Sequence, residues 1–189
     1  MSPDKVVAVT NRTLCARPFL DQAERVCRFR PAAFILREKD LPEPDYEALA
    51  ADVLALCQRY AVPCILHSFP DAAARLGVKQ LHLPLWRLEE LAGPALARFE
   101  TVGASVHSVE EAVRAQALGA SYVTAGHIYA TDCKKGLPPR GLGFLRSVCA
   151  GVSIPVYAIG GIRLEERQIE EVLRCGAAKA CVMSGMMAL

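Results

Sequence analysis

The densest group of polar residues lies in the segment from Gly126 to Gly141, which begins at the end of an apolar, strand-like run and is expected to form the longest loop of the chain. Its second residue is His127, and a basic pair, Lys134-Lys135, lies further along. An imidazole with its ordinary pKa, about 6.5, can take up and return protons at neutral pH. Loops that follow strands carry the active sites of many α/β enzymes. The pattern therefore predicts His127 as a proton-transferring residue rather than a histidine held only for packing.

Two cations follow another apolar run. Arg37 and Lys39 are two positions apart, so both face the same side of an extended chain. If that side is inward, a guanidinium fork and an ammonium charge can bind a carboxylate or a phosphate. The same pattern also fits a charged turn in solvent. Ser105 and His107 share a face in the same way, which makes them further candidates for ligand contacts.

Pairs of small residues follow the last two apolar runs: Gly160-Gly161 and Ser184-Gly185. Backbone N–H groups in such loops bind phosphate, and barrels commonly form phosphate sites after their last two strands. The first apolar run is followed by residues 10–14, Thr-Asn-Arg-Thr-Leu, which contain no glycine. A dinucleotide-binding sheet would need a G-x-G-x-x-G loop at that place. The sequence therefore favours a phosphate site late in the chain.

His67 and His82 also end apolar runs, which raises the question of a metal site. However, the four histidines of the chain form no H-E-x-x-H pair, and the nearest carboxylates are Asp71 and Asp132. We therefore predict no metal ligands here. Trp86 is expected to pack a helix against the strands.

Eight apolar runs alternate with helical patterns, as in sheets of parallel strands covered on both faces. The predicted strands are 5–10, 32–37, 63–67, 80–83, 101–106, 121–126, 155–159 and 179–183. Right-handed crossovers leave a closed barrel or an open doubly wound sheet, and the late glycine pairs favour the barrel. We predict an α/β fold, a TIM (β/α)8 barrel in one domain over residues 1–189. Because the chain ends at Leu189, its eighth helix is expected to be missing or very short.

The helices carry recognisable ends. Asp45 is expected to cap a helix that continues to Tyr60. Ser108 and Glu111 form a capping-box pattern, and another helix is predicted over residues 164–175. Three helices are expected to end in the same way, each at a glycine followed by a small apolar residue: Gly77, Gly119 and Gly176.

Composition sets the class of protein. The 189 residues are 52% hydrophobic and 22% charged with a net charge of +2, which gives no electrostatic reason to expect nucleic acid. No apolar stretch approaches the roughly 20 residues of a membrane-spanning helix, and the start of the chain does not resemble a signal peptide. The eight cysteines form no C-x-x-C pair and are expected to be reduced, buried thiols, so we predict a cytoplasmic protein. A missing eighth helix would leave barrel surface that a second copy of the chain could cover.

Taken together, these segments resemble the thiamine phosphate synthase/TenI superfamily along essentially the whole chain. The general marks of the superfamily are at 36–39 (Leu-Arg-Glu-Lys), 158–162 (Ala-Ile-Gly-Gly-Ile) and 182–185 (Val-Met-Ser-Gly). The TenI branch in particular is resembled at 103–108 (Gly-Ala-Ser-Val-His-Ser) and 126–136, which includes Thr-Asp-Cys-Lys-Lys-Gly. The synthase branch has Asn-Asp after the third strand and H-L-G-Q-x-D after the fourth, where aspartates hold magnesium. This chain has His67-Ser68 and, at 82–86, His-Leu-Pro-Leu-Trp.

The resemblance implies a thiazole tautomerase of thiamin biosynthesis, an isomerase that converts a 2-carboxythiazole phosphate tautomer to its aromatic form without a cofactor. His127 and Lys39 would be catalytic, and backbone amides would bind the phosphate at Gly160, Gly161, Ser184 and Gly185. The substrate would also contact Arg37, Ser105, His107 and Lys135. Two alternatives stay open: a magnesium-dependent thiamine phosphate synthase, and a non-catalytic regulatory barrel that binds a phosphorylated ligand.

Overall fold

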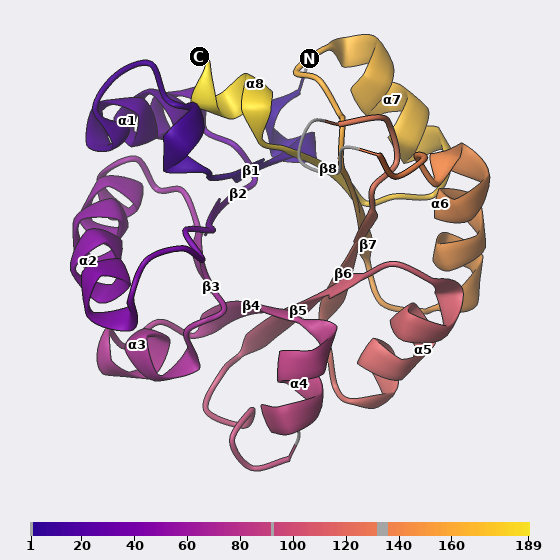
Figure 1. Cartoon of the computed structure of the whole chain (residues 1–189), viewed down its shortest axis with the longest axis horizontal. Coiled ribbons are helices and arrows are strands. Elements are labelled where there is room, and N and C mark those ends of the chain that lie inside the picture. The colour runs from indigo at the N-terminus through magenta and orange to yellow at the C-terminus, as the bar shows by residue number, and fades with distance from the viewer. Residues whose placement is uncertain (1, 92, 132–135) are drawn as a thin grey trace.

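A computed structural model describes residues 2–91, 93–131 and 136–189, and its eight parallel strands form a closed barrel in the order β1 to β8. Figure 1 looks down this barrel, with the helices arranged around it. The predicted barrel is confirmed, and every predicted strand overlaps an observed one. The strands are β1 (Val6–Val9), β2 (Ala33–Leu36), β3 (Cys64–His67), β4 (Gln80–Pro84), β5 (Thr101–Val106), β6 (Tyr122–Gly126), β7 (Val156–Ile159) and β8 (Lys179–Val182).

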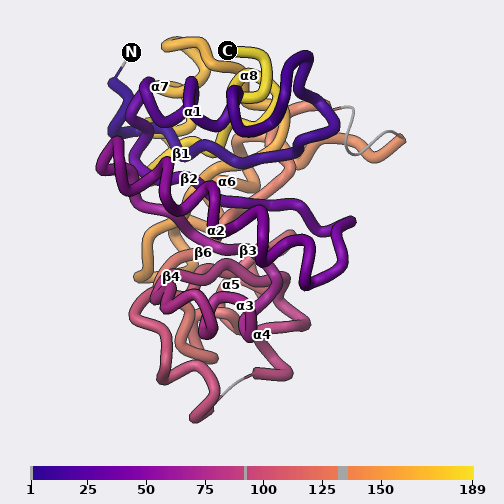
Figure 2. Tube along the Cα trace, turned by 90° about the vertical axis from the view of Figure 1, so that its left-hand side faces the viewer, coloured from indigo at the N-terminus to yellow at the C-terminus, as the bar shows by residue number. Residues whose placement is uncertain are grey.

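The helices follow the strands in turn and include the very short final helix that the sequence predicts. They are α1 (Phe19–Phe29), α2 (Glu43–Arg59), α3 (Pro70–Arg75), α4 (Leu85–Leu91), α5 (Val109–Ala117), α6 (Gly141–Gly151), α7 (Glu166–Arg174) and α8 (Ser184–Met187), with 3-10 turns η1 (Pro3–Lys5) and η2 (Arg12–Leu14). Figure 2 shows α8 beside α1. Gln22 of α1 donates a hydrogen bond to the Met186 carbonyl at 2.6 Å, so this one-turn helix is fastened to its neighbour.

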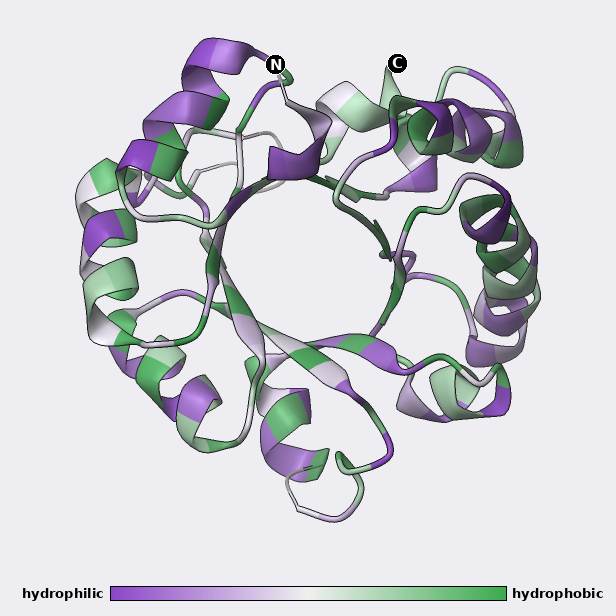
Figure 3. Ribbon diagram, turned by 180° about the vertical axis from the view of Figure 1, so that it is seen from behind, coloured by the Kyte–Doolittle hydropathy of each residue, from purple (hydrophilic) through white to green (hydrophobic). Residues whose placement is uncertain are grey.

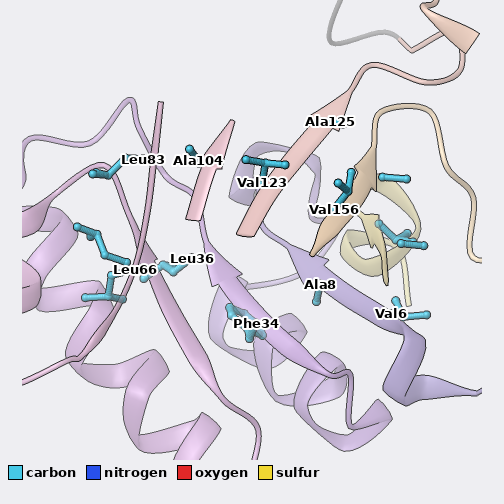
Figure 4. Packing of buried hydrophobic residues seen from close by; sticks show 14 of the residues in the cluster. Val6, Ala8, Phe34, Leu36, Leu66, Leu83, Ala104, Val123, Ala125 and Val156 are labelled. Carbon is cyan, nitrogen blue, oxygen red and sulfur yellow. The ribbon is translucent and has the colours of Figure 1, made fainter. Parts of the chain in front are cut away.

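Alternation along each strand divides the apolar residues into two layers, because successive side chains of a strand point to opposite faces. The larger layer fills the space between strands and helices, and Figure 4 shows part of it: Val6, Ala8, Phe34, Leu36, Leu66, Leu83, Ala104, Val123, Ala125 and Val156. The smaller layer lies inside the barrel and contains Val7, Val9, Ala33, Ile35, Ile65, Tyr122 and Cys181. The residues of this smaller layer therefore face the barrel axis, and the residues that alternate with them along the strands face the helices.

Polar residues lie mainly on the outer helices, as the hydropathy colouring of Figure 3 shows. Among the described residues, no helix is both long and apolar enough to cross a membrane. The cysteines of this part of the chain are free thiols, and four of them are buried: Cys27, Cys57, Cys175 and Cys181.

The predicted helix ends are confirmed in one case and differ from the structure in two others. Ser108 caps α5 as predicted, since its Oγ accepts a hydrogen bond from the Glu111 N–H at 3.0 Å. The assignment of Asp45 as a cap is wrong, because α2 begins at Glu43 after Pro42 and Asp45 lies within the first turn. Prolines suit the first turn of a helix, which explains the earlier start. The helix predicted over 164–175 is shorter at both ends, Glu166–Arg174.

The expected packing role of Trp86 is also wrong. Its side chain is 59% exposed on the first turn of α4. Leu88, two positions later, is the fully buried residue of this helix, so α4 turns Leu88 toward the barrel and Trp86 toward solvent.

Candidate active site

Parallel strands in one barrel bring all their carboxyl ends to the same end of the molecule, which is where barrel enzymes place their active sites. At this end the inward positions of β3 to β6 are polar. His67, His82 and Thr124 are buried there, and Ser105 is half-buried. Strand register places Ser105 beside both Pro84 and Thr124, so β4, β5 and β6 present inward residues at the same level of the barrel.

His82 is the centre of this polar group. Its Nδ1 lies 3.0 Å from the hydroxyl oxygen of Tyr122, and its Nε2 lies 2.9 Å from Ser105 Oγ. Thr124 Oγ1 lies 3.4 Å from both His82 Nε2 and Ser105 Oγ. The imidazole of His67 stacks on His82 with ring centroids 5.4 Å apart. Three strands thus contribute to one continuous hydrogen-bonded group inside the barrel.

The buried imidazoles are held in the neutral form. Burial, reinforced by the positive charge of Arg37, lowers the pKa of His82 to about 3. Burial also lowers the pKa of His67 well below its ordinary value, with further contributions from His82, Arg37 and Lys39. Arg37 contributes to the low pKa of both imidazoles, so its positive charge acts on this end of the barrel.

Arg37 and Lys39 occupy the carboxyl end of β2, one half-buried and the other exposed. The residue between them, Glu38, is 1% exposed and faces the other way. Its carboxylate accepts hydrogen bonds from the Arg12 backbone N–H at 3.0 Å and from the Arg12 guanidinium at 3.2 Å. Arg12 also donates two hydrogen bonds to Asp40, at 2.7 and 2.8 Å. This ion-pair network fastens the cation-bearing turn to the loop after β1.

Two more hydrogen bonds fix the same turn. The Arg37 backbone N–H donates to Thr10 Oγ1 at 2.8 Å. The hydroxyl of the fully buried Tyr46 donates to the Leu36 carbonyl at 2.7 Å and accepts from the His67 backbone N–H at 2.9 Å. One tyrosine therefore ties the ends of β2 and β3 to helix α2.

His127 follows β6 directly and is 8% exposed. Its Nε2 lies 3.4 Å from the Leu137 carbonyl oxygen, and its own carbonyl accepts from the Arg140 N–H at 3.0 Å. Its backbone packs against Gly160, where an added Cβ would lie 2.3 Å from His127 Cβ. The buried position at a strand end agrees with the sequence prediction and gives the imidazole a fixed place beside the β7–α7 loop.

His107 lies next to this strand end but is exposed. Its Nδ1 lies 2.9 Å from the Gly126 carbonyl oxygen. A carbonyl oxygen only accepts hydrogen bonds, so Nδ1 carries the proton and a neutral His107 has its lone pair on Nε2. Ser105 and His107, which are predicted to share a face, have different surroundings: Ser105 joins the buried hydrogen-bonded group, and His107 lies toward solvent.

The predicted phosphate loops take two forms. Gly160 has a φ of +100° and Gly161 a φ of +69°, both in the left-handed region that favours glycine. Ser184 and Gly185 begin α8, and the N–H groups of the next two residues, Met186 and Met187, both donate to the Met183 carbonyl at 3.0 Å. Lys135 lies outside the described residues.

Sequence reasoning missed Tyr122, Thr124 and the pair Arg12–Glu38. The first two carry a usable signal, because Tyr122, Thr124 and Gly126 alternate along β6 and share the inward face with Ser105. The ion pair joins residues 26 positions apart and has no local signal.

The described residues do not fit a magnesium site at the ends of β3 and β4. Magnesium prefers oxygen ligands, chiefly carboxylates, and these ends present His67, Ser68 and Pro84. The carboxylates at the end of β2 are already bound by Arg12. Within residues 2–91, 93–131 and 136–189, no three side chains of the metal-binding types gather into a candidate site.

A hollow of about 280 Å³ lies away from this site. It is shallow and open, between α2 and the starts of β3 and β4, and is lined by residues such as Gln58, Cys64 and Gln80. These starts are at the opposite end of the strands from the polar group, so the hollow is not part of the candidate active site.

Comparison with known proteins gives a consistent result. A family model described as thiamine monophosphate synthase matches residues 6–186. A thiamine-phosphate synthase of Thermus thermophilus is 35% identical over 171 residues, covering 89% of this chain and 81% of the relative. A "Thiamine-phosphate synthase 2" of Streptococcus pneumoniae is 30% identical over 189 residues, covering 97% and 87%. A solved thiamine phosphate pyrophosphorylase of Pyrococcus furiosus superposes with a TM-score of 0.80 at 28% identity, covering 98% of this chain and 88% of that structure.

Proposed function

Because this chain belongs to the thiamine phosphate synthase/TenI superfamily, we propose that it is a cofactor-free tautomerase that acts on a phosphorylated carboxythiazole. One observation carries the proposal. A buried imidazole, His127, lies at the end of β6, while the ends of β3 and β4 present His67, Ser68 and Pro84 instead of carboxylates. The site is suited to moving a proton and poorly suited to holding a metal.

The reaction moves one proton from the ring carbon to the exocyclic carbon, so it needs a base, an acid and a stabilised anion. His127 removes the ring proton as the base, and the imidazolium that forms returns a proton to the exocyclic carbon in the second step, directly or through a second proton carrier. The exposed His107 lies one residue from His127 along the hydrogen bond to Gly126, and its Nε2 lone pair makes it the best candidate for a second proton carrier. Negative charge that develops between the two transfers is stabilised by Arg37 and Lys39.

The remaining residues position the substrate. Arg37 binds the carboxylate, Lys135 and Ser105 orient the ring, and the backbone amides at Gly160, Gly161, Ser184 and Gly185 bind the phosphate. The hydrogen bonds from Arg12 to Glu38 and Asp40 support this assignment, because they hold the turn that carries both cations in place before the substrate arrives.

A second candidate, thiamine phosphate synthase, is favoured by the names of the relatives. That reaction joins a thiazole phosphate to a pyrimidine pyrophosphate and relies on magnesium to stabilise the leaving pyrophosphate. The residues at the ends of β3 and β4 argue against it, and an assay separates the two.

The test supplies the purified chain with the thiazole tautomer in EDTA and follows formation of the aromatic ring by its absorbance. We expect the rate of tautomer conversion to be the same with and without EDTA. His127→Asn should lower kcat by about 10²–10⁴-fold, the usual contribution of general acid–base catalysis. Unchanged affinity of this variant for the aromatic product would show that its site is intact.

The contrary outcomes are distinct. Formation of thiamin phosphate from both synthase substrates, only with magnesium and without conversion of the tautomer, would establish the synthase. Product binding without any conversion would indicate a regulatory barrel. Unchanged turnover by His127→Asn would remove the histidine from the mechanism.

A further inference from the structure

The direction of the hydrogen bonds around His82 follows from the chemistry of its partners. Tyr122 is 2% exposed, and within the described part of the chain its hydroxyl has one hydrogen-bond partner, His82 Nδ1 at 3.0 Å. Burial raises the pKa of Tyr122 well above its ordinary value, so the group remains a phenol with a proton to donate. If Nδ1 donated instead, the phenol proton would be buried without an acceptor, which is unfavourable. Tyr122 therefore donates to Nδ1.

The other ring nitrogen is then fixed as well. A neutral imidazole carries one proton, and with Nδ1 accepting, that proton lies on Nε2. Nε2 is 2.9 Å from Ser105 Oγ, so His82 donates to Ser105. The low pKa of His82 keeps the imidazole neutral, so the hydrogen bonds from Tyr122 through His82 to Ser105 keep this one direction.

Ser105 is where the chain of hydrogen bonds ends. A hydroxyl has two lone pairs and one proton. One lone pair accepts from His82 Nε2, and the other accepts from Thr124 Oγ1 at 3.4 Å. The proton of Ser105 is left to bond elsewhere, and the half-buried residue lies at the carboxyl end of β5, where the ligand is expected.

Neighbouring groups pack closely around the rings of Tyr122 and His82. An added Cβ at Gly103 would lie 2.1 Å from Tyr122 Cζ and 2.5 Å from His82 Nδ1, so both rings occupy the space over this glycine. Tyr157 stacks on the far side of Tyr122 with centroids 4.5 Å apart, and His67 stacks on His82. Packing therefore confines the rings to this place, and their hydrogen-bond partners set the orientation of the imidazole.

We propose that Tyr122 and His82 are positioning residues that fix Ser105 as a hydrogen-bond donor to the substrate. The site then selects a ligand that presents an acceptor atom at the end of β5, such as a carboxylate oxygen or an unprotonated ring nitrogen, and disfavours one that presents an N–H. This inference rests on the proposed function only for the identity of the ligand, because the hydrogen-bond direction is a property of the free protein.

The first measurement needs no substrate. In protein labelled with ¹⁵N-histidine, NMR distinguishes protonated from unprotonated ring nitrogens, and His82→Gln identifies the His82 signals. We expect a single Nε2–H form in the wild type and a mixture of both forms in Tyr122→Phe. Tyr157→Phe is the matched control, a neighbouring ring of the same stack, and should leave the His82 signals unchanged. A wild-type Nδ1–H form, or an unaltered Nε2–H form in Tyr122→Phe, would overturn the proposal.

The second measurement is a double-mutant cycle on affinity for the aromatic carboxythiazole phosphate. Tyr122→Phe and Ser105→Ala should each weaken binding about 3–10-fold, the value of one oriented hydrogen bond. The double variant should bind no worse than Ser105→Ala alone, because the tyrosine acts through the serine. Losses that multiply would mean that Tyr122 has only a structural role.

Turnover adds a third readout that separates the two proposals. In Tyr122→Phe, KM should rise by the same factor as the binding constant while kcat changes less than about twofold. If the chain proves not to be a tautomerase, the NMR result still decides the hydrogen-bond direction. If the tautomerase holds and the NMR forms are reversed, only the present inference fails.

Discussion

The interior of this barrel has two halves that are built differently. On the side of β8, β1 and β2 it is apolar, with Val7, Val9, Ile35 and Cys181 all buried. On the side of β3 to β6 it is polar, with His67 and His82 buried beside Ser105 and Thr124. The buried residues of the apolar half serve as core, and the proposed ligand-binding groups of this half lie beyond the ends of its strands, on the turn with Arg37 and Lys39 and at Ser184 and Gly185. In the polar half the same residues fill the barrel and form the candidate site, so a substitution there is expected to affect both stability and the proposed ligand binding.

The largest test of this contrast is a cavity in the apolar half. Ile35→Ala should lower the free energy of unfolding by about 2–5 kcal/mol, because Ile35 is 2% exposed and its loss leaves a space that neighbours fill only in part. Turnover per folded molecule should remain unchanged, as measured below the unfolding transition. Ile35→Val, at about 0.5–1.5 kcal/mol, is the graded control. A loss of kcat in step with stability would break the distinction between the halves.

On the polar side, Gly160→Ala should affect both properties together. The new Cβ would lie 2.3 Å from His127 Cβ at a backbone φ of +100°, so we expect a loss of about 2–4 kcal/mol in unfolding free energy and a marked fall in kcat. Gly143→Ala is the matched control, since nothing lies within 4 Å of its added Cβ. In helix α6 it should stabilise by up to about 1 kcal/mol. Full activity in Gly160→Ala would contradict the assigned place of His127.

Glu38 tests the turn at the end of β2 in the apolar half, which carries Arg37 and Lys39. Glu38→Gln keeps the size of the side chain but weakens its hydrogen bonds to Arg12, and should cost about 1–3 kcal/mol in urea unfolding. Ligand affinity should fall with it, because the turn that carries Arg37 and Lys39 loosens. Asp40→Asn, at an exposed partner of the same arginine, should have a smaller effect. Equal effects of the two substitutions would mean that burial of Glu38 is unimportant.

The last test is a pH dependence of stability that belongs to the polar half. Burial lowers the pKa of both His67 and His82 in the folded chain, that of His82 to about 3, so below the ordinary 6.5 the unfolded chain binds protons that the folded chain does not. Stability is therefore complete above pH 6.5 and decreases below it, by up to about 1.4 kcal/mol per pH unit for each histidine. His82→Gln should reduce this slope in urea titrations. A slope that is the same in wild type and variant would show that His82 is not a buried neutral imidazole.

The two halves also differ in how far sequence alone predicts them. Strands and the barrel follow from the apolar runs and the glycines that end helices, and His127, Arg37 and Ser105 follow from their places after strands. The hydrogen bonds of His82 do not, because they join residues 23 and 40 positions away through closure of the barrel. Trp86 shows the same limit in reverse: its size suggested packing, but the rotation of α4 about its axis, set by Leu88, decides its exposure.

The close packing of His127 on Gly160 has a consequence for how binding energy is used. With the phosphate bound at Gly160 and Gly161 as proposed, the phosphate group of the substrate and the imidazole that moves its proton both contact the same short backbone segment. Energy gained at the distant phosphate is then available to align the reacting carbon with the imidazole. A thiazole without its phosphate should consequently react more slowly even at saturation, and should not simply bind more weakly.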